Sequence, residues 1–453
     1  MSPHDLLVRG ARFGWLPGAP AGDVAIADGV FAEVGGQVAG SAAEEIDASG
    51  LHALPGGVDP HVHLNEPGRT DWEGIATGTA ALAVGGVTCA IDMPLNSSPP
   101  VVDGASFDAK AAAVAGVARV ELALWGGLVP GDVDRFDELA ARGVVGFKAF
   151  MSYGGLDDFP PVDDLTLYEG MARAASLRRP VAVHAESDAI TAGLAARARA
   201  AGRVGVRDYL ASRPVVAETE AISRALHLAA QTGCALHVVH VSSGRGVALV
   251  AEARARGVDA TCEVCPHHLV LDEQDAERLG AIAKCAPPLR PRAECDALWA
   301  ALAAGDVAMV SSDHSPSPPT LKEGNDAFAV WGGIAGAQSS LELLLSEGVH
   351  RGRVALHALG EQFAAAAARR FALPGKGVVA PGADADLVLL DLGSVRVLQP
   401  SELRSRHAIS PYVGRELRGR IVRTILRGRT VALHGEVVGD ARGRLLLGAP
   451  TVA

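Results

Sequence analysis

Lysine is scarce in this sequence, and arginine supplies almost all of the positive charge. The formal net charge is −11, and no run of Lys or Arg forms a basic patch. This balance argues against a surface that binds nucleic acid or an anionic membrane. It also makes any lysine inside an apolar strand a candidate functional residue. The lysines are Lys110, Lys148, Lys284, Lys322 and Lys376.

The sequence also lacks the features of a secreted or membrane-spanning protein. Its six cysteines follow no disulfide spacing, which is typical of a reducing cytosol. Residues 1–12 contain no basic region followed by an apolar core, so no signal peptide is predicted. The longest apolar run, residues 80–95, is interrupted by Asp92 and is too short to cross a bilayer. We therefore expect a soluble, cytoplasmic protein.

Both ends of the chain carry short strand patterns separated by glycine turns. They are residues 5–9, 23–26 and 30–34 at one end, and residues 386–391, 421–426, 430–433 and 436–438 at the other. Each group is too small to bury a core alone. We therefore predict one small β-sandwich domain built from residues 1–54 and 373–453, rather than two separate binding modules.

Residues 55–372 alternate between apolar strands and segments of helical periodicity. The strand candidates are residues 58–63, 87–93, 121–128, 145–151, 180–186, 235–241, 259–265 and 307–313. Eight strands, each with a helical crossover, predict an α/β fold of the (β/α)8 TIM barrel type. An open doubly wound sheet is the alternative, but no Gly-rich phosphate-binding fingerprint follows the first strand.

Polar residues end five of these apolar strands. The first strand, approached through an apolar stretch at residues 51–54, ends in His61 and His63, which alternation places on one face. The later strand ends carry Lys148, His184, His240 and Asp313. In a parallel barrel these ends meet at one mouth, where catalytic residues lie. A single buried histidine is more often structural, but six polar residues that each cost burial free energy predict a common site.

The predicted site has the ligand set of a two-metal centre. Four histidines and one aspartate are more than one catalytic zinc requires, and they suit two divalent ions with a bridging ligand. An ammonium group would be repelled there, whereas burial lowers a lysine pKa from about 10.4 and frees a nucleophilic amine. Addition of CO2 would turn Lys148 into an anionic carbamate. The alternative is a lysine that extends its ammonium group to the barrel rim.

These residues, with longer motifs, resemble the binuclear metal-dependent amidohydrolase superfamily in its cyclic-amidase branch, and within it most closely the allantoinase group. The motifs are residues 61–69, 92–97, 217–221, 261–268, 284–290, 312–316, 331–336 and 410–415. The resemblance implies two divalent metal ions, zinc in the first place, bridged by N6-carboxylysine at Lys148. The other implied ligands are His61, His63 and Asp313 for the first ion, and His184 and His240 for the second.

The resemblance also implies a reaction and an assembly. A metal-bridged hydroxide attacks the ring carbonyl, and Asp313 acts as general base and then general acid. The implied reaction opens the hydantoin ring of allantoin, a small cyclic ureide, to give allantoate in purine catabolism. Relatives are commonly homotetramers. For the polar edge of the substrate we nominate Asn96, Cys285 and Ser315.

Three other functions fit parts of this pattern. A dihydropyrimidinase or hydantoinase shares the metals and the bond type and is the main alternative. A dihydroorotase places an arginine where Asn65 stands, to bind the substrate carboxylate. A metal-free scaffold relative would be expected to have lost ligands, and all six are present.

Two other features are predicted to be structural. Residues three apart on a strand face opposite sides, so Cys262 and Cys265 cannot both face one metal ion. By the same reasoning His237 should point away from the metals held by His240, towards the helices.

Overall fold

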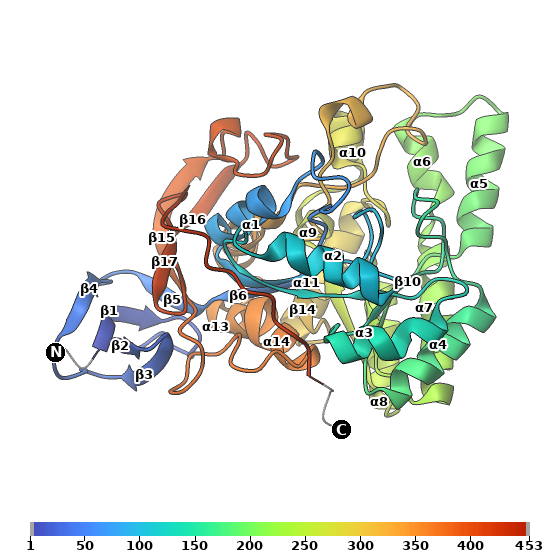
Figure 1. Ribbon diagram of the computed structural model, residues 1–453. Coiled ribbons are helices and arrows are strands. Elements are labelled where there is room, and N and C mark those ends of the chain that lie inside the picture. Colours follow the sequence, from blue (N-terminus) through green and yellow to red (C-terminus); the bar gives the residue numbers. More distant parts are fainter. Residues whose placement is uncertain (1–3, 450–453) are drawn as a thin grey trace.

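The computed structural model describes residues 4–449, in which both ends of the chain join in one sheet beside a barrel (Figure 1). This sheet has the strand order β18-β17-β16-β15-β5-β1-β2-β3, with β4 paired to β1. Its strands are β1 (His4–Phe13), β2 (Ala21–Ala27), β3 (Val30–Gly35), β4 (Ala42–Asp47), β5 (His52–Pro55), β15 (Leu387–Val397), β16 (Glu416–Leu426), β17 (Arg429–Leu433) and β18 (Glu436–Val437).

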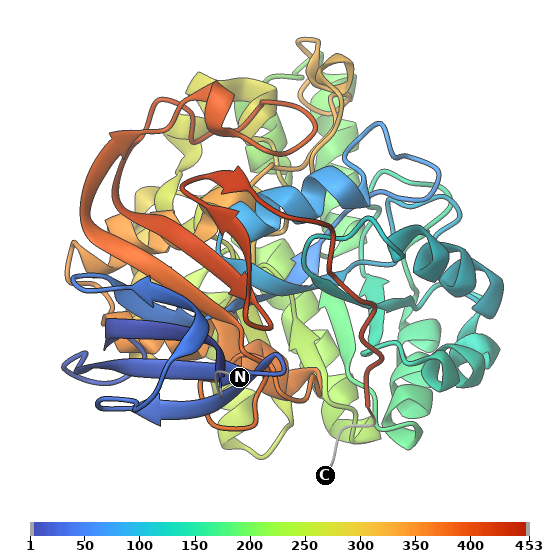
Figure 2. The ribbon, with the colours of Figure 1, turned by 60° about the vertical axis from the view of Figure 1, so that its left-hand side comes forward.

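The two ends are joined by antiparallel pairing of β5 with β15, in which Leu54 lies opposite Val388. Figure 2 shows the blue N-terminal strands next to the orange and red C-terminal ones. Leu6 and Ile26 from one end pack in the same buried cluster as Leu387 and Ile425 from the other. The core of this sheet therefore needs both ends, as the sequence predicted.

The barrel consists of eight parallel strands. They are β6 (Gly57–Val62), β7 (Val87–Asp92), β8 (Glu121–Leu124) continued by β9 (Gly126–Gly127), β10 (Phe147–Phe150), β11 (Val181–His184), β12 (Leu236–Val238), β13 (Ala260–Val264) and β14 (Met309–Val310). β8 pairs with β7 and β9 pairs with β10, so the two short pieces act as one strand. A parallel bridge between Val62 and His314 closes the ring, which confirms the predicted (β/α)8 barrel.

Helices cover the outside of the barrel. They are α1 (Ile75–Val84), α2 (Gly104–Val114), α3 (Phe136–Arg142), α4 (Asp164–Ser176), α5 (Asp188–Ala200), α6 (Val206–Ser212), α7 (Val215–Thr232), α8 (Gly244–Ala255), α9 (Pro266–Val270), α10 (Glu273–Leu279), α11 (Arg292–Ala304), α12 (Ser340–Leu343), α13 (Leu356–Gly360) and α14 (Ala366–Arg370). None of the helices among the described residues is long and apolar enough to cross a membrane.

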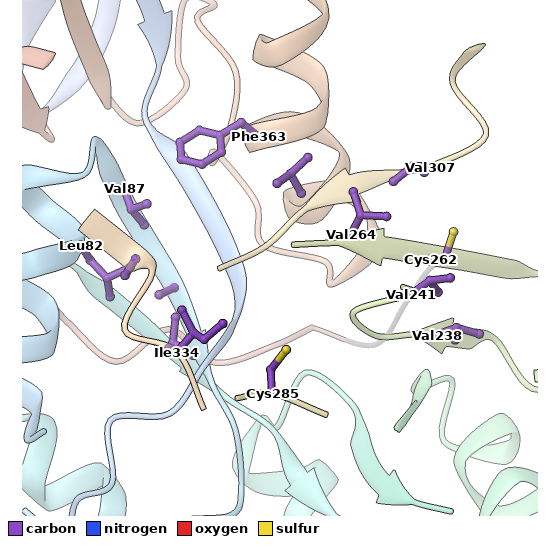
Figure 3. Close-up of a cluster of buried hydrophobic side chains, with 14 of the residues drawn as sticks. Leu82, Val87, Val238, Val241, Cys262, Val264, Cys285, Val307, Ile334 and Phe363 are labelled. Carbon is purple, nitrogen blue, oxygen red and sulfur yellow. The ribbon is translucent and has the colours of Figure 1, made fainter. Parts of the chain in front are cut away.

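Strand side chains alternate between two buried clusters. Ala90 on β7 belongs to the same outer buried cluster as Leu82 of α1, part of which is drawn in Figure 3. Cys89 and Ile91 on the same strand belong to a second cluster with Trp125. This alternation is the period-2 pattern of a strand, with one face against the helices and the other inside the barrel. The inner cluster fills the barrel below the mouth, so polar groups at the strand ends rest on an apolar floor.

The approach to the first histidines differs from the prediction. Residues 51–54 were expected to run into the strand that carries His61, but β5 belongs to the terminal sheet and β6 begins anew at Gly57. At the switch point, a Cβ on Gly56 would come within 2.2 Å of Thr88 Oγ1. The crossing from sheet to barrel therefore requires glycine.

A segment after the last strand returns to the barrel. Leu446 donates to Leu122 O on β8, and Leu122 donates to Arg444 O, at 2.7 and 2.9 Å. Gly443 donates to Ala118 O at 2.9 Å, and Gly448 to Gly143 O at 2.7 Å. Residues 443–448 thus add backbone pairing to strands of the opposite half of the chain.

Candidate active site

The predicted residues meet in a cavity at the C-terminal ends of the barrel strands. The cavity measures about 470 Å³. It is lined by His61, His63, His184, His240 and Asp313 among the predicted metal ligands, and by Asn96, Cys285 and Ser315 among the predicted substrate contacts. Lys148 lies on β10 and is fully buried. The barrel therefore brings together residues as far apart in the chain as His61 and Ser315.

Three ligand atoms converge at the first strand. Asp313 Oδ1 lies 3.2 Å from His61 Nε2 and 3.4 Å from His63 Nε2. The other nitrogen of His61, Nδ1, lies 2.6 Å from Glu263 Oε1, which fixes the proton there. The Nε2 atoms and the carboxylate oxygen are thus free to bind one ion, and the three side chains lie within the spacing of a metal site.

A second pair of nitrogens faces each other beside this group. His184 Nδ1 lies 3.1 Å from His240 Nε2. Glu186 Oε2 lies 2.9 Å from His184 Nε2 and also contacts Arg213, so the ring presents its Nδ1 lone pair to His240. Burial lowers the pKa of both histidines, which favours the neutral imidazoles that metals require.

Lys148 lies buried beside these groups without a hydrogen-bond partner on Nζ among the residues described. Its Nζ lies 4.9 Å from the ring centroid of Phe150. Burial lowers the pKa of Lys148 to about 7, although the charges of Glu263 and Asp313 oppose this shift. A large fraction of the amine is therefore neutral near pH 7, the state that reacts with CO2.

The donor set fits two divalent metal ions. Nitrogen and carboxylate oxygen donors at two neighbouring positions suit zinc and other first-row divalent ions. The pair His184 and His240 lacks a third strong protein donor among the described residues. Lys148, whose buried Nζ has no hydrogen-bond partner, lies close enough for its charge to lower the pKa of both rings. A carbamate on Lys148 would satisfy this buried atom and supply the missing anionic ligand.

Asp313 and His240 lie where the backbone leaves the strand conformation. Their φ angles are +43° and +37°, in the left-handed region that costs a non-glycine residue about 1–2 kcal/mol. Burial by itself would raise the pKa of Asp313, but positive charge on His61 and the hydrogen bond to His63 lower it below the usual range. The carboxylate is therefore ionised and aimed into the cavity at a cost in backbone strain.

The prediction for His237 is wrong, because the alternation does not continue to His240. β12 ends at Val238, and the positive φ of His240 turns its side chain. His237 Nε2 instead lies 3.0 Å from Glu263 Oε2, inside the barrel beneath His61. It therefore supports the metal site through Glu263 instead of facing the helices.

Sequence reasoning missed two buried carboxylates that hold the histidines. Glu263 bonds to the rings of His61 and His237, and Glu186 bonds to the ring of His184. Both are fully buried. The signal for them was present: a carboxylate inside an apolar strand for Glu263, and a carboxylate two residues after a ligand, on the same face, for Glu186.

A third group of possible metal donors lies among buried residues of the barrel. Cys265, His267 and His268 lie within metal-binding distance of one another. Burial raises the pKa of the Cys265 thiol well above its usual value, so the metal-free protein keeps this sulfur as a neutral thiol. Cys262 packs in the outer cluster, apart from Cys265, which lies 3.5 Å from Ser311 Oγ. The two cysteines thus face different surroundings and form no pair.

The predicted substrate contacts lie together on the cavity wall. Asn96 Nδ2 lies 3.4 Å from Ser315 Oγ, which joins the loops after the second and eighth strands. Cys285 lines the same cavity from the loop that follows α10. Lys284 and Trp331, which open two of the motifs quoted above, also line the cavity, as do Tyr153 and Arg213, which the sequence did not single out.

Comparison with known proteins gives matches along nearly the whole chain. The amidohydrolase family matches residues 52–431. An allantoinase of Rubrobacter xylanophilus is 58% identical over 98% of both chains, and one of Escherichia coli is 46% identical over 90% of this chain and 91% of its own. Among solved structures, an L-hydantoinase from Arthrobacter aurescens has a TM-score of 0.94 at 35% identity, with 98% of this chain and 99% of that chain covered.

Proposed function

The chain belongs to the amidohydrolase family, and we propose that it is a metal-dependent cyclic amide hydrolase that opens the hydantoin ring of allantoin to give allantoate. The observation that carries this proposal is the high identity to allantoinases over almost the full length of both chains. The cavity geometry agrees with it, because metal-binding groups and polar edge groups share one pocket.

We assign the metal ligands as the sequence predicts. His61, His63 and Asp313 would hold one ion, His184 and His240 the other, and Lys148, carboxylated to N6-carboxylysine, would bridge them. Zinc is the proposed metal, since imidazole and carboxylate donors suit it. When bound, such ions supply a Lewis acid for the ring carbonyl and a strong nucleophile from water at neutral pH.

Asp313 carries the proton transfers in this proposal. As an ionised carboxylate in the cavity, it accepts a proton from the attacking water. The same carboxyl group then returns that proton to the ring nitrogen as the C–N bond breaks. The net reaction adds one water molecule, with the hydroxyl on the former carbonyl carbon and the hydrogen on the leaving nitrogen.

Asn96, Cys285 and Ser315 are the proposed contacts to the polar edge of the ring, through side chain or backbone. A pocket built to hydrogen-bond a ureido group rejects analogues that lack it, because its buried polar groups would stay unpaired. A cytoplasmic location, a homotetrameric assembly and a place in purine catabolism complete the proposal. They rest on the likeness to the allantoinases of this branch.

Hydrolysis of another hydantoin or a dihydropyrimidine is the second candidate. The fold match to an L-hydantoinase favours it, but at lower identity than the allantoinases. A dihydroorotase is disfavoured, because Asn65 is buried and its amide bonds to Pro316 O, so it offers the substrate no positive charge.

A substrate panel tests the proposal directly. Metal-loaded enzyme is assayed with allantoin, hydantoin, dihydrouracil and dihydroorotate. We expect kcat/KM for allantoin to exceed that for each other substrate by at least about 100-fold, because only allantoin carries a ureido side chain on its ring. Faster turnover of hydantoin or dihydrouracil would move the assignment to the second candidate.

A further inference from the structure

The outer wall of the cavity is a segment with little regular structure. Residues 323–333 contain no helix or strand, and Phe328, Trp331 and Gly333 of this segment line the cavity. We call residues 326–333 the wall segment. No strand pairs with the wall segment among the described residues. Backbone hydrogen bonds from Ala327 to Val204 O and from Trp331 to Leu321 O hold it, together with side chains that bind its carbonyl groups.

Two lysines bind three carbonyl groups of the wall segment. Lys284 donates to Val330 O. Lys322 donates to Gly333 O at 2.6 Å and to Trp331 O at 3.1 Å. The segment is also tied by its backbone, since Gly333 donates to Lys284 O at 2.7 Å. Four successive residues of the wall thus contain three carbonyls held by ammonium groups.

These lysines have no carboxylate partner among the residues described. The ammonium group of Lys284 instead lies 4.7 Å from the ring centroid of Tyr209. Burial lowers the pKa of Lys284 to about 8 and that of Lys322 to about 7. The positive charge of Arg213 lowers the pKa of Lys284 further, and that of Lys284 lowers the pKa of Lys322. Only five lysines occur in the chain, and two of them are placed here at this electrostatic cost.

The held segment packs closely on both sides. Trp331 meets Trp72 edge to face with ring centroids 4.7 Å apart. On its other side, a Cβ added to Gly155 would come within 3.2 Å of the Trp331 ring. A wall segment released from its lysines would lose this fit and change the width of the cavity.

We propose that Lys284 and Lys322 are positioning residues that hold residues 326–333 as the outer wall of the substrate pocket and thereby set the affinity for the substrate. This inference rests on the proposed function only in naming the pocket occupant, a small cyclic ureide. It assigns neither lysine a role in bond breaking, because the ammonium groups of both side chains are engaged by backbone carbonyls of the wall segment.

The test uses Lys284→Met and Lys322→Met in the metal-loaded enzyme. Methionine keeps the length of the side chain and removes its three donors. We expect KM for allantoin to rise about tenfold in each variant with kcat changed less than about twofold, because ground-state and transition-state binding are lost together. Bound metal should stay at the wild-type level. Hydrogen exchange followed by mass spectrometry should be faster in peptides that cover residues 323–333.

Matched variants separate positioning from a general loss of stability. Lys284→Arg keeps the charge and the donors and should recover most of the affinity. Arg207→Met removes a cation whose side chain is 81% exposed on α6 and should leave KM and exchange unchanged.

Unchanged exchange over residues 323–333 would overturn the proposal, as would a loss of kcat at constant KM. A fall in thermal stability with normal KM would reduce both lysines to structural residues. If wild-type enzyme fails to hydrolyse allantoin, the proposed function fails, but the exchange measurement still decides whether the lysines hold the wall.

Discussion

Two of the three buried lysines, Lys148 and Lys376, lie near opposite ends of the barrel, and their surroundings are opposite. Near the mouth, Lys148 Nζ has no hydrogen-bond partner among residues 4–449. At the start of β8, Lys376 Nζ lies 2.8 Å from Asp384 Oδ2 and 3.0 Å from Asp386 Oδ2, and it also contacts Glu121. One lysine has too few partners for its charge, and the other has more carboxylates than it can neutralise.

The neighbours decide the chemistry of the same side chain. Burial lowers the pKa of Lys148 to about 7. Burial would do the same to Lys376, but the charges of Asp386 and Glu121 raise its pKa above the ordinary value. A paired lysine at the junction of barrel and terminal sheet stays an ammonium ion and holds the two parts together. An unpaired one is a reactive amine, and burial alone does not tell them apart.

Removal of the unpaired lysine should give the largest effect. We expect Lys148→Met to lower kcat/KM by at least about 10⁴-fold, because the bridging anion and with it the two-metal centre are lost. Metal analysis should show fewer than two ions per chain. Short carboxylates such as acetate or propionate should restore part of the activity by taking the place of the carbamate.

Wild-type activity in Lys148→Met would remove the carbamate from the proposal. Lys376→Met serves as the matched control, since it deletes a buried lysine of the same size outside the cavity.

Asp313→Asn should lower kcat by about 10³-fold, within the usual range for a general acid–base group. The amide cannot accept the proton from water, although it keeps the shape of the side chain. Circular dichroism should be unchanged. Turnover at the wild-type rate would show that Asp313 is not the acid–base group and would leave it only the role of a metal ligand.

Lys376→Met tests the lysine that is paired with carboxylates. It leaves Glu121, Asp384 and Asp386 with only Arg427 nearby as a partner, so we expect a loss of about 3–5 kcal/mol in the free energy of unfolding. Urea unfolding measures it. Activity below the transition should match wild type, because the cluster lies far from the cavity residues. A stable variant with impaired turnover would contradict the separation of the two lysines.

The smallest effect is the pH dependence of stability in metal-free protein. With the pKa of Lys148 about 7 when folded and 10.5 as the ordinary value, the unfolded chain binds more protons between these values. Stability from this group should therefore rise with pH from about 7 towards 10.5. Urea midpoints at pH 6 and pH 9 should show it in wild type, relative to Lys148→Met. The raised pKa of Lys376 predicts the reverse, a contribution kept below 10.5 and lost only in strong alkali.

Much of the barrel could be predicted because its strands are apolar and bounded by turns. Residues 181–184 are buried throughout, and His184 ends the strand as alternation requires. The terminal strands were harder. Ala42–Asp47 forms β4 with mostly exposed side chains, so no apolar pattern marks it. β5 and β6 read as one strand, because their separation depends on a close contact at Gly56 that no pattern records.

At the site, the residue types predicted that the histidines lie close together, but not which carboxylates bond to their rings. Glu263 joins His61 to His237, three residues from three strands, and this link depends on side-chain geometry inside the barrel. The predicted orientation of His237 was wrong for a local reason: the positive φ at His240 breaks the alternation of side chains between the two residues. Alternation predicts side-chain direction reliably inside a hydrogen-bonded strand. It fails just past the end of the strand, where the functional residues lie.

The return of residues 443–448 to β8 has a consequence for synthesis. Gly443 passes so near the barrel that a Cβ would lie 1.9 Å from Val120 O, and its neighbours complete hydrogen bonds of a strand made more than 300 residues earlier. On the ribosome, that side of β8 stays without its partner until more than 300 further residues have been made. Contacts between segments so far apart in the sequence slow folding, so this part of the barrel is completed late.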